Sequence, residues 1–240
     1  MSTLLEVGVA GFAICHPEPG TRPQPSILPP NERRRAPDTV AVALEVAQAA
    51  CLDAGRDPAQ LPTVFASTYG DLAITDYMCG TLAAAPTTLS PTRFHNSVHN
   101  AAAGYWSIAT ACRQPYCALG AGQYTFGAGL FAAALQACAD QTDVLLVAYD
   151  IEARGPLARI AHSQGILGVA VVLSAALGGA SMRLQLAVNE SAPTRHSDSA
   201  SVNAMAACLP LITALERQVA AVLTVPLGPN STLEVRLRPG

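Results

Sequence analysis

Residues 90–148 read SPTRFHNSVHNAAAGYWSIATACRQPYCALGAGQYTFGAGLFAAALQACADQTDVLLVA and decide the fold class of the chain. Within them, residues 99–110 have a helical pattern, and residues 116–121 form a short apolar run typical of a strand. The Ala-rich residues 125–139 predict a second helix, and DVLLVA at residues 143–148 predicts a buried strand. This alternation of helices and strands indicates an α/β fold with a parallel or mixed sheet.

The rest of the chain continues the alternation and divides into two parts. Residues 38–54 predict a strong helix, with Asp38 as a candidate N-cap after Pro37 and Gly55 as a natural stop. Other strands are predicted at residues 4–14, 64–67, 168–175, 182–188, 220–225 and 232–238, other helices at 71–84 and 204–217, and proline-imposed loops at 17–30 and 86–91. Residues 1–178 therefore form an almost complete α/β layer, and residues 179–240 add a smaller β-α-β-β part of the same compact unit.

Composition excludes several classes of function. The chain has 240 residues, of which 50% are hydrophobic and 13% charged, and its formal net charge is −3. A globular fold is expected, without a general attraction to nucleic acid or to anionic membranes. All 14 basic residues are arginine, which excludes a phosphate loop, a pyridoxal Schiff base and any other site that needs a catalytic amine.

Cysteine usage and hydropathy predict a cytoplasmic protein. The seven cysteines form no CxxC pair, so reduced thiols are expected. Residues 1–14 lack the positively charged start of a secretion signal, and the longest later apolar run, residues 165–180, is shorter than the roughly 20 residues of a membrane span.

The segment that decides the fold resembles the first half of β-ketoacyl synthases of the thiolase superfamily. The matching positions are Ser90-Pro91, Asn100, Ala102-Ala103-Gly104, Ser107-Ile108, Pro115 and Asp143-Val144, whereas Gln114 replaces the glycine that precedes the proline in the family. Similar elements lie upstream at residues 4–11, 42–55 and 64–70, so the resemblance covers residues 1–178. It implies a thiolase-like layered α/β fold, with a near-complete first half and a truncated second half at residues 179–240.

The same resemblance places Gly122-Gln123 where condensing enzymes have an Ala-Cys pair. Condensation needs a thiolate at a strand-to-helix turn, where the helix N-terminus lowers its pKa. By resemblance it also needs two histidines in THGTGT and KxxxGH motifs; neither motif is present, and His162 and His196 have other contexts. We therefore expect a subunit that does not condense acyl chains itself. The simpler interpretation is that Gln123 only begins a helix and satisfies its own amide.

In the families that this segment resembles, glutamine at this position marks chain-length-factor subunits and domains that decarboxylate malonyl thioesters. FASTYGD at residues 65–71 and FHNSVHNAAAGYWSI at residues 94–108 are similar to chain-length-factor-like subunits of bacterial aryl polyene pathways. The resemblance implies a heterodimer with an intact ketosynthase that elongates chains on an acyl carrier protein, and it implies no cofactor or metal. The alternatives are a malonyl-carrier-protein decarboxylase that uses Gln123, and a homodimeric acyl-binding protein.

Two groups of residues are expected to do the work of such a subunit. By resemblance, the dimer interface lies on a sheet-edge strand formed by Tyr116, Cys117, Ala118, Leu119, Gly120 and Ala121. The far end of the partner's acyl tunnel is expected to be closed by Ile74, Tyr77, Met78, Arg93 and Phe94. Bulky side chains at that end would set chain length sterically.

Three other patterns carry less weight. His95 and His99 have the i, i+4 spacing of a two-histidine metal helix, but no third ligand is evident, so hydrogen-bonded histidines near an interface are expected. Residues 127–132 fit the dinucleotide pattern GxGxxA but lie inside a predicted helix, so their glycines are expected to allow close packing. Three cysteines in apolar runs are expected to be buried: Cys112, Cys117 and Cys138.

Overall fold

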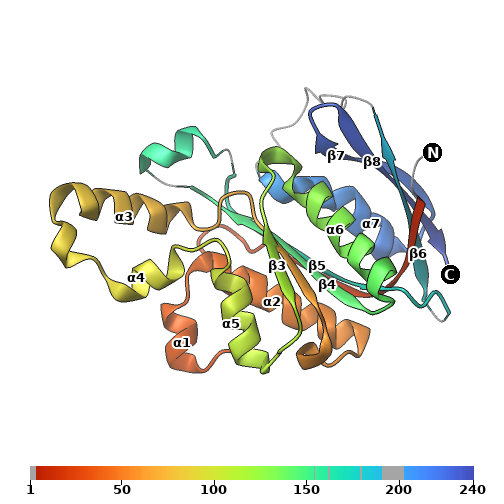
Figure 1. Ribbon diagram of the computed structural model, residues 1–240, viewed down its shortest axis with the longest axis horizontal. Coiled ribbons are helices and arrows are strands. Elements are labelled where there is room, and N and C mark those ends of the chain that lie inside the picture. Colours follow the sequence, from red (N-terminus) through yellow and green to blue (C-terminus); the bar gives the residue numbers. More distant parts are fainter. Residues whose placement is uncertain (1–3, 154, 162, 179, 191–202) are drawn as a thin grey trace.

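A mixed eight-stranded sheet organises the chain, with strand order β3-β2-β4-β5-β1-β6-β8-β7 (Figure 1). The computed structural model describes residues 4–153, 155–161, 163–178, 180–190 and 203–240. The strands are β1 (Leu4–Cys15), β2 (Thr63–Ala66), β3 (Tyr116–Leu119), β4 (Val144–Ile151), β5 (Ile166–Ser174), β6 (Met182–Asn189), β7 (Ala221–Gly228) and β8 (Ser231–Pro239). β2 pairs in parallel with β3 and β4, and the pairings from β4 through β5, β1, β6 and β8 to β7 are antiparallel.

Helices cover both faces of the sheet, as the continuous apolar runs of β4 and β5 require. They are α1 (Pro30–Arg35), α2 (Asp38–Ala54), α3 (Leu72–Ala84), α4 (Pro91–Asn96), α5 (Ala101–Thr110), α6 (Thr125–Asp140) and α7 (Leu209–Arg217). One core lies under α2 and α5 and contains Phe65 and Trp106. The other lies under α6 and α7, where Phe126 and Leu130 pack with Val7 and Val235.

The C-terminal strands bend around α6. β6 continues the sheet beyond β1, and the β7–β8 hairpin follows it so that β7 contacts α6 (Figure 1). A Cβ atom at Gly127 would collide with the carbonyl of Pro226 in β7, and one at Gly129 would lie 2.9 Å from Cβ of Ala66 in β2. The glycines of the GxGxxA pattern therefore allow α6 to pack between β2 and β7.

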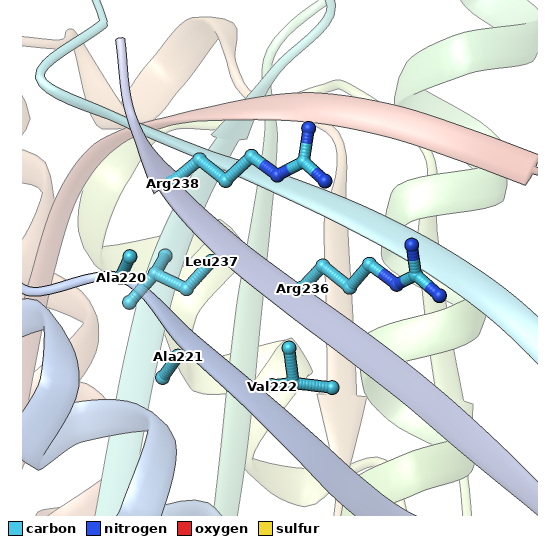
Figure 2. Close-up of a pocket in the computed structure, with 6 residues that line it drawn as sticks. All are labelled: Ala220, Ala221, Val222, Arg236, Leu237 and Arg238. Carbon is cyan, nitrogen blue, oxygen red and sulfur yellow. The ribbon is translucent and has the colours of Figure 1, made fainter.

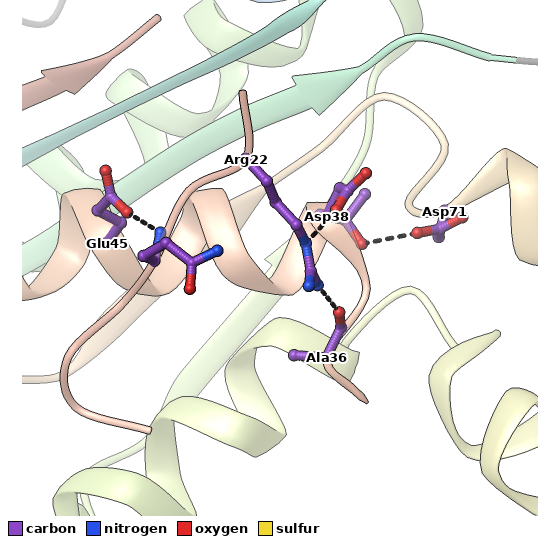
Figure 3. Close-up of polar contacts among 7 residues, drawn as sticks. Arg22, Ala36, Asp38, Glu45 and Asp71 are labelled. Carbon is purple, nitrogen blue, oxygen red and sulfur yellow. Dashed lines mark hydrogen bonds and ion pairs between the residues drawn. The ribbon is translucent and has the colours of Figure 1, made fainter. Parts of the chain in front are cut away.

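Polar contacts fix the start of α2, where the prediction that Asp38 is the N-cap was wrong. Asp38 is the first residue of α2 rather than its N-cap, which is Pro37. The Asp38 carboxylate instead accepts a 2.6 Å hydrogen bond from Nε of Arg22, which reaches it from the proline-rich segment 16–29 (Figure 3). The neighbouring Thr39 donates to Asp71, the N-cap of α3, over 3.0 Å (Figure 3).

Other predicted boundaries also differ from the structure. β3 ends at Leu119, so Gly120 and Ala121 lie beyond the strand that was expected to include them. The loop expected at residues 86–91 contains a 3-10 turn at Pro86–Thr88 and ends where α4 begins at Pro91. Proline is compatible with the first turn of a helix, which is the conformation that both segments adopt. The helix expected from residue 99 begins at Ala101, because residues 97–100 turn the chain from α4 into α5.

Candidate functional site

The turn between β3 and α6 is held in one conformation by its own hydrogen bonds. Gly122 has φ of 56°, in the left-handed region that favours glycine. The Thr125 hydroxyl donates to the Gly122 carbonyl over 2.7 Å and accepts from the Ala121 amide over 2.9 Å. Thr125 is fully buried and begins α6, so the turn presents residue 123 at the N-terminus of a 16-residue helix.

Gln123 occupies this turn with an exposed side chain. Its Nε2 donates a 2.8 Å hydrogen bond to the hydroxyl of Tyr124. A carboxamide has no proton that it could lose near neutral pH, so the Gln123 side chain cannot act as a thiolate does at a strand-to-helix turn. The 3-10 turn Gly122–Tyr124 also contacts β7, which brings residues of the C-terminal part next to Gln123.

β3 is the terminal strand of the sheet, at the opposite edge from β7. The amide of Thr63 donates to the Pro115 carbonyl, and that of Ser67 donates to the Leu119 carbonyl, each over 3.1 Å. Because backbone groups alternate along a strand, the N–H and C=O groups of Tyr116 and Ala118 point away from β2. The chain therefore offers unpaired backbone groups along one side of β3.

Two side chains of β3 are exposed. Tyr116 is 45% exposed and its hydroxyl accepts a 2.9 Å hydrogen bond from Nδ2 of Asn100. Cys117 is exposed, contrary to the burial expected from its apolar surroundings, because it lies on the edge strand. Of the other two cysteines, Cys112 is buried as expected and Cys138 is partly buried.

A polar cluster that the sequence analysis missed lies where β2 and β4 end. Asp150 is 5% exposed, and its carboxylate accepts hydrogen bonds from the hydroxyls of Ser67 and Ser163 over 3.1 and 3.0 Å. The Thr68 amide adds a third bond of 3.3 Å, yet burial of the carboxyl raises the pKa of Asp150 above its ordinary value. An aspartate that ends the apolar run VLLVAYD was the signal available in the sequence.

This cluster also joins distant parts of the chain. Nδ2 of Asn203 donates to the Asp150 carbonyl over 3.4 Å, and the Ala204 amide donates to the Ser163 hydroxyl over 3.0 Å. On the other side, Nε2 of His99 lies 2.8 Å from the Ser67 carbonyl oxygen. Asp150 thus acts as a structural centre between the end of the parallel strands and the C-terminal part.

His95 and His99 are not arranged as two metal ligands on one turn of a helix. α4 ends at Asn96 and α5 begins at Ala101, so His95 and His99 are not on one helix. The His95 ring lies 5.9 Å from the Tyr105 ring, between centroids, while His99 binds Ser67. In the described part of the chain, no three His, Cys, Asp or Glu side chains are grouped so that they could hold a metal ion. His162 and His196 lie outside the described residues.

The five residues expected at a tunnel end lie on α3 and α4, which project from the sheet as an arm at the left of Figure 1. Cζ of Arg93 lies 3.8 Å from the centroid of the Tyr77 ring, so these two are brought together. On α3, Met78 is buried and Ile74 is partly buried. Phe94 follows Arg93 on α4 and is 61% exposed.

Comparison with protein families decides the relationship. Residues 12–225 match the family model described as "Beta-ketoacyl synthase, N-terminal domain". The chain belongs to the β-ketoacyl synthase family. This confirms the resemblance inferred from residues 90–148, whereas comparison with curated protein sequences finds no match.

Solved structures similar to this β-ketoacyl synthase family member support the same fold. One is from a ketosynthase (ApeO) in complex with its chain length factor (ApeC) from Xenorhabdus doucetiae, with 18% identity, a TM-score of 0.70 and 98% of each chain covered. A chain of the ishigamide ketosynthase/chain length factor has 14% identity, a TM-score of 0.72 and covers 98% of this chain and 99% of its own.

A third similar chain comes from AntDE:AntF, a type II polyketide synthase acyl-carrier protein in complex with its ketosynthase bound to the hexaketide. It has 10% identity, a TM-score of 0.74, and covers 99% of this chain and 100% of its own. These likenesses confirm the thiolase-like layered α/β fold. Among the described helices of this family member, none is both long and apolar enough to cross a bilayer.

Proposed function

We propose that this chain is a non-catalytic, chain-length-factor-like partner of a ketosynthase in type II polyketide or fatty-acid-like (aryl polyene) chain elongation. The observation that carries the proposal is Gln123, which stands on an ordered strand-to-helix turn. The resemblance of residues 90–148 to β-ketoacyl synthases puts the cysteine of condensing enzymes at this position. The turn keeps its supporting hydrogen bonds. In this proposal, glutamine in place of cysteine therefore removes the nucleophile without altering the fold. In this proposal the partner supplies the cysteine and both histidines and receives chains from an acyl carrier protein.

The surface around β3 supports a protein partner at this edge. Outward-facing backbone groups of Tyr116 and Ala118 can pair with another strand. An unpaired edge strand favours association with another chain. The similar solved structures include complexes of a ketosynthase with its chain length factor, which supports a heterodimer.

The arm formed by α3 and α4 suits a steric role. Arg93 stacks on Tyr77 and holds the ring in place, while the buried Met78 lies one residue further along α3. We infer that Ile74, Tyr77, Met78, Arg93 and Phe94 close the far end of an acyl tunnel that is completed by the partner. Chain length would then depend on side-chain volume at that end, with no chemistry by this subunit.

The interface is tested by Ala118→Pro in co-expression with the ketosynthase. Proline removes an N–H that points away from β2, so the β2–β3 ladder keeps its hydrogen bonds while pairing across the edge is blocked. Ala118→Val keeps the N–H and is the matched control. We expect one-to-one copurification with wild type and with the valine variant, and its loss with the proline variant. Undiminished copurification of Ala118→Pro would contradict pairing through β3.

A second experiment separates this role from decarboxylation by Gln123. The purified chain is incubated with malonyl carrier protein without a ketosynthase, and carrier-bound products are followed by mass spectrometry. We expect no acetyl carrier protein to form. Formation of acetyl carrier protein that is lost in Gln123→Ala would favour the decarboxylase, and a stable homodimer with no affinity for a ketosynthase would favour the acyl-binding protein.

Chain-length control is tested by truncating side chains of the arm in the reconstituted pair. Tyr77→Ala and Met78→Ala enlarge the proposed tunnel end, so we expect longer products. Leu82→Ala, at an exposed position of α3, is the matched control and should leave the product distribution unchanged. An unchanged distribution in both test variants would refute the gating role without affecting the proposed heterodimer.

A further inference from the structure

The outer face of the C-terminal strands carries three arginines at neighbouring positions. Arg183 of β6 is the direct cross-strand partner of Arg238 of β8, and Arg236 lies two residues before Arg238 on the same face. Their neighbours Leu184 and Leu237 point into the core, which fixes the arginines on the outside. Figure 2 shows the side chains of Arg236 and Arg238 on the same side of β8.

Two of these arginines have no acidic partner in the part of the chain that the structure describes. Arg236 forms a 2.6 Å ion pair with Glu234, but none of the ion pairs between described residues includes Arg183 or Arg238. Nε of Arg183 is buried and has no hydrogen-bond partner among the described residues. The nearest acid along β1 is Glu6, which is paired with Gln185 rather than with Arg183. Like charges directly opposite each other destabilise an antiparallel pair, and a buried unpaired donor adds a further cost.

An apolar hollow adjoins two of the arginines. A shallow pocket of about 320 Å³ is lined by Ala220, Ala221, Val222, Arg236, Leu237 and Arg238 (Figure 2). Val222 is 68% exposed and is the cross-strand partner of Arg236. The pocket therefore places apolar side chains of β7 beside the charged end of β8.

We propose that this face binds an organic phosphate monoester, with the phosphate between Arg183 and Arg238 and its apolar group in the pocket beside Val222. Guanidinium groups bind phosphate oxygens through paired charge-assisted hydrogen bonds. A monoester carries a charge of roughly −1.5 to −2 at neutral pH, which matches the two arginines that have no acidic partner among the described residues. The face lies at the end of the sheet opposite β3, so it stays accessible when β3 is covered.

The binding test uses isothermal titration calorimetry at constant ionic strength with the full chain, copurified with its ketosynthase if the complex forms. The probes are n-butyl phosphate, inorganic phosphate and butyrate. We expect n-butyl phosphate to bind about tenfold more tightly than inorganic phosphate, because about two of its methylene groups become buried. Butyrate, which has one charge, should bind more weakly than n-butyl phosphate.

Variants identify the site. Arg238→Gln and Arg183→Gln should each weaken n-butyl phosphate binding roughly tenfold, while Arg217→Gln, at an exposed position of α7, should not change it. Val222→Ser should reduce the advantage of n-butyl phosphate over inorganic phosphate.

The midpoint temperature of thermal unfolding tests independently whether Arg183 and Arg238 repel each other. In chloride buffer, Arg238→Gln should unfold at the same or a higher temperature than wild type, because it relieves the like-charge pair. Equal affinity of wild type and both arginine variants, or no binding of n-butyl phosphate by wild type at millimolar concentration, would overturn the proposal.

Discussion

Asp150 is a buried acid whose ionisation couples stability to pH. Burial raises the pKa of Asp150, so the folded protein keeps this proton to a higher pH than the unfolded chain, where aspartate has a pKa of about 3.9. Its contribution to stability is therefore complete below about pH 4 and is lost as pH rises through the raised pKa. Asp150→Asn cannot ionise, so its urea-unfolding midpoint should fall less than that of wild type between pH 4 and 8.

The control for this prediction is Asp140→Asn, at an exposed position at the end of α6, which should follow the wild-type pH curve. Asp71 also has a pKa raised by burial, so Asp150→Asn should keep part of the slope. Parallel curves for wild type and Asp150→Asn would show that Asp150 does not take up its proton on folding.

At this scale, sequence reasoning found Gln123 and missed Asp150 for a physical reason. Gln123 lies at a fixed distance from Asn100 and Pro115 along one continuous segment, so motif spacing was enough to place it on the turn between a strand and a helix. The partners of Asp150 are 83 and 13 residues away, at Ser67 and Ser163. Only the pairing of β2 with β4 brings Ser67 beside Asp150, and strand pairing of that kind is not encoded in a local pattern.

Helix α6 depends on a missing side chain at Gly127. Alanine normally stabilises a helix interior by about 1 kcal/mol relative to glycine. At Gly127 the added Cβ would collide with the carbonyl of Pro226, so Gly127→Ala should separate β7 from α6 and lower the free energy of unfolding by roughly 1–3 kcal/mol. Gly104→Ala in α5, where nothing lies within 4 Å of the new Cβ, should instead raise stability by up to about 1 kcal/mol.

Urea denaturation of the two alanine variants measures these opposite signs. Both variants replace glycine by alanine inside a helix, so the contribution of helix propensity to stability is the same in each. The difference between their free energies of unfolding therefore reports the collision at Gly127. If Gly127→Ala were as stable as Gly104→Ala, the contact between α6 and β7 would be loose enough to adapt.

The elements differ in how far the sequence could define them. Helix α2 was predicted with its observed bounds because Pro37 and Gly55 act locally, and Gly55 does adopt the left-handed conformation of a helix stop. α4 was not predicted, because a six-residue helix that begins with proline has no clear periodicity. The bend of β6, β8 and β7 around α6 was not predictable either, since it is set by tertiary packing at Gly127 and Val225.

At the scale of the whole molecule, one sheet carries two cores on opposite faces. The core under α2 and α5 is built from residues before 173. The core under α6 and α7 combines both parts of the chain, for example Val7 and Leu146 with Leu184, Leu211 and Val235. Removing residues 179–240 would expose Val7, Phe126 and Leu130, so we expect the first part to be unstable alone.

Two natural reporters test whether the two cores unfold together. Trp106, the single tryptophan, is fully buried in the core under α2 and α5. Cys208 is fully buried in the other core, where burial raises the pKa of its thiol to about 12. Because β1, β4 and β5 contribute to both cores, tryptophan fluorescence and alkylation of Cys208, located by mass spectrometry, should share one urea midpoint. The exposed Cys79 should be alkylated at every urea concentration and calibrates the reagent. Alkylation of Cys208 at a lower urea concentration than the change at Trp106 would mean that the C-terminal part unfolds as a separate unit.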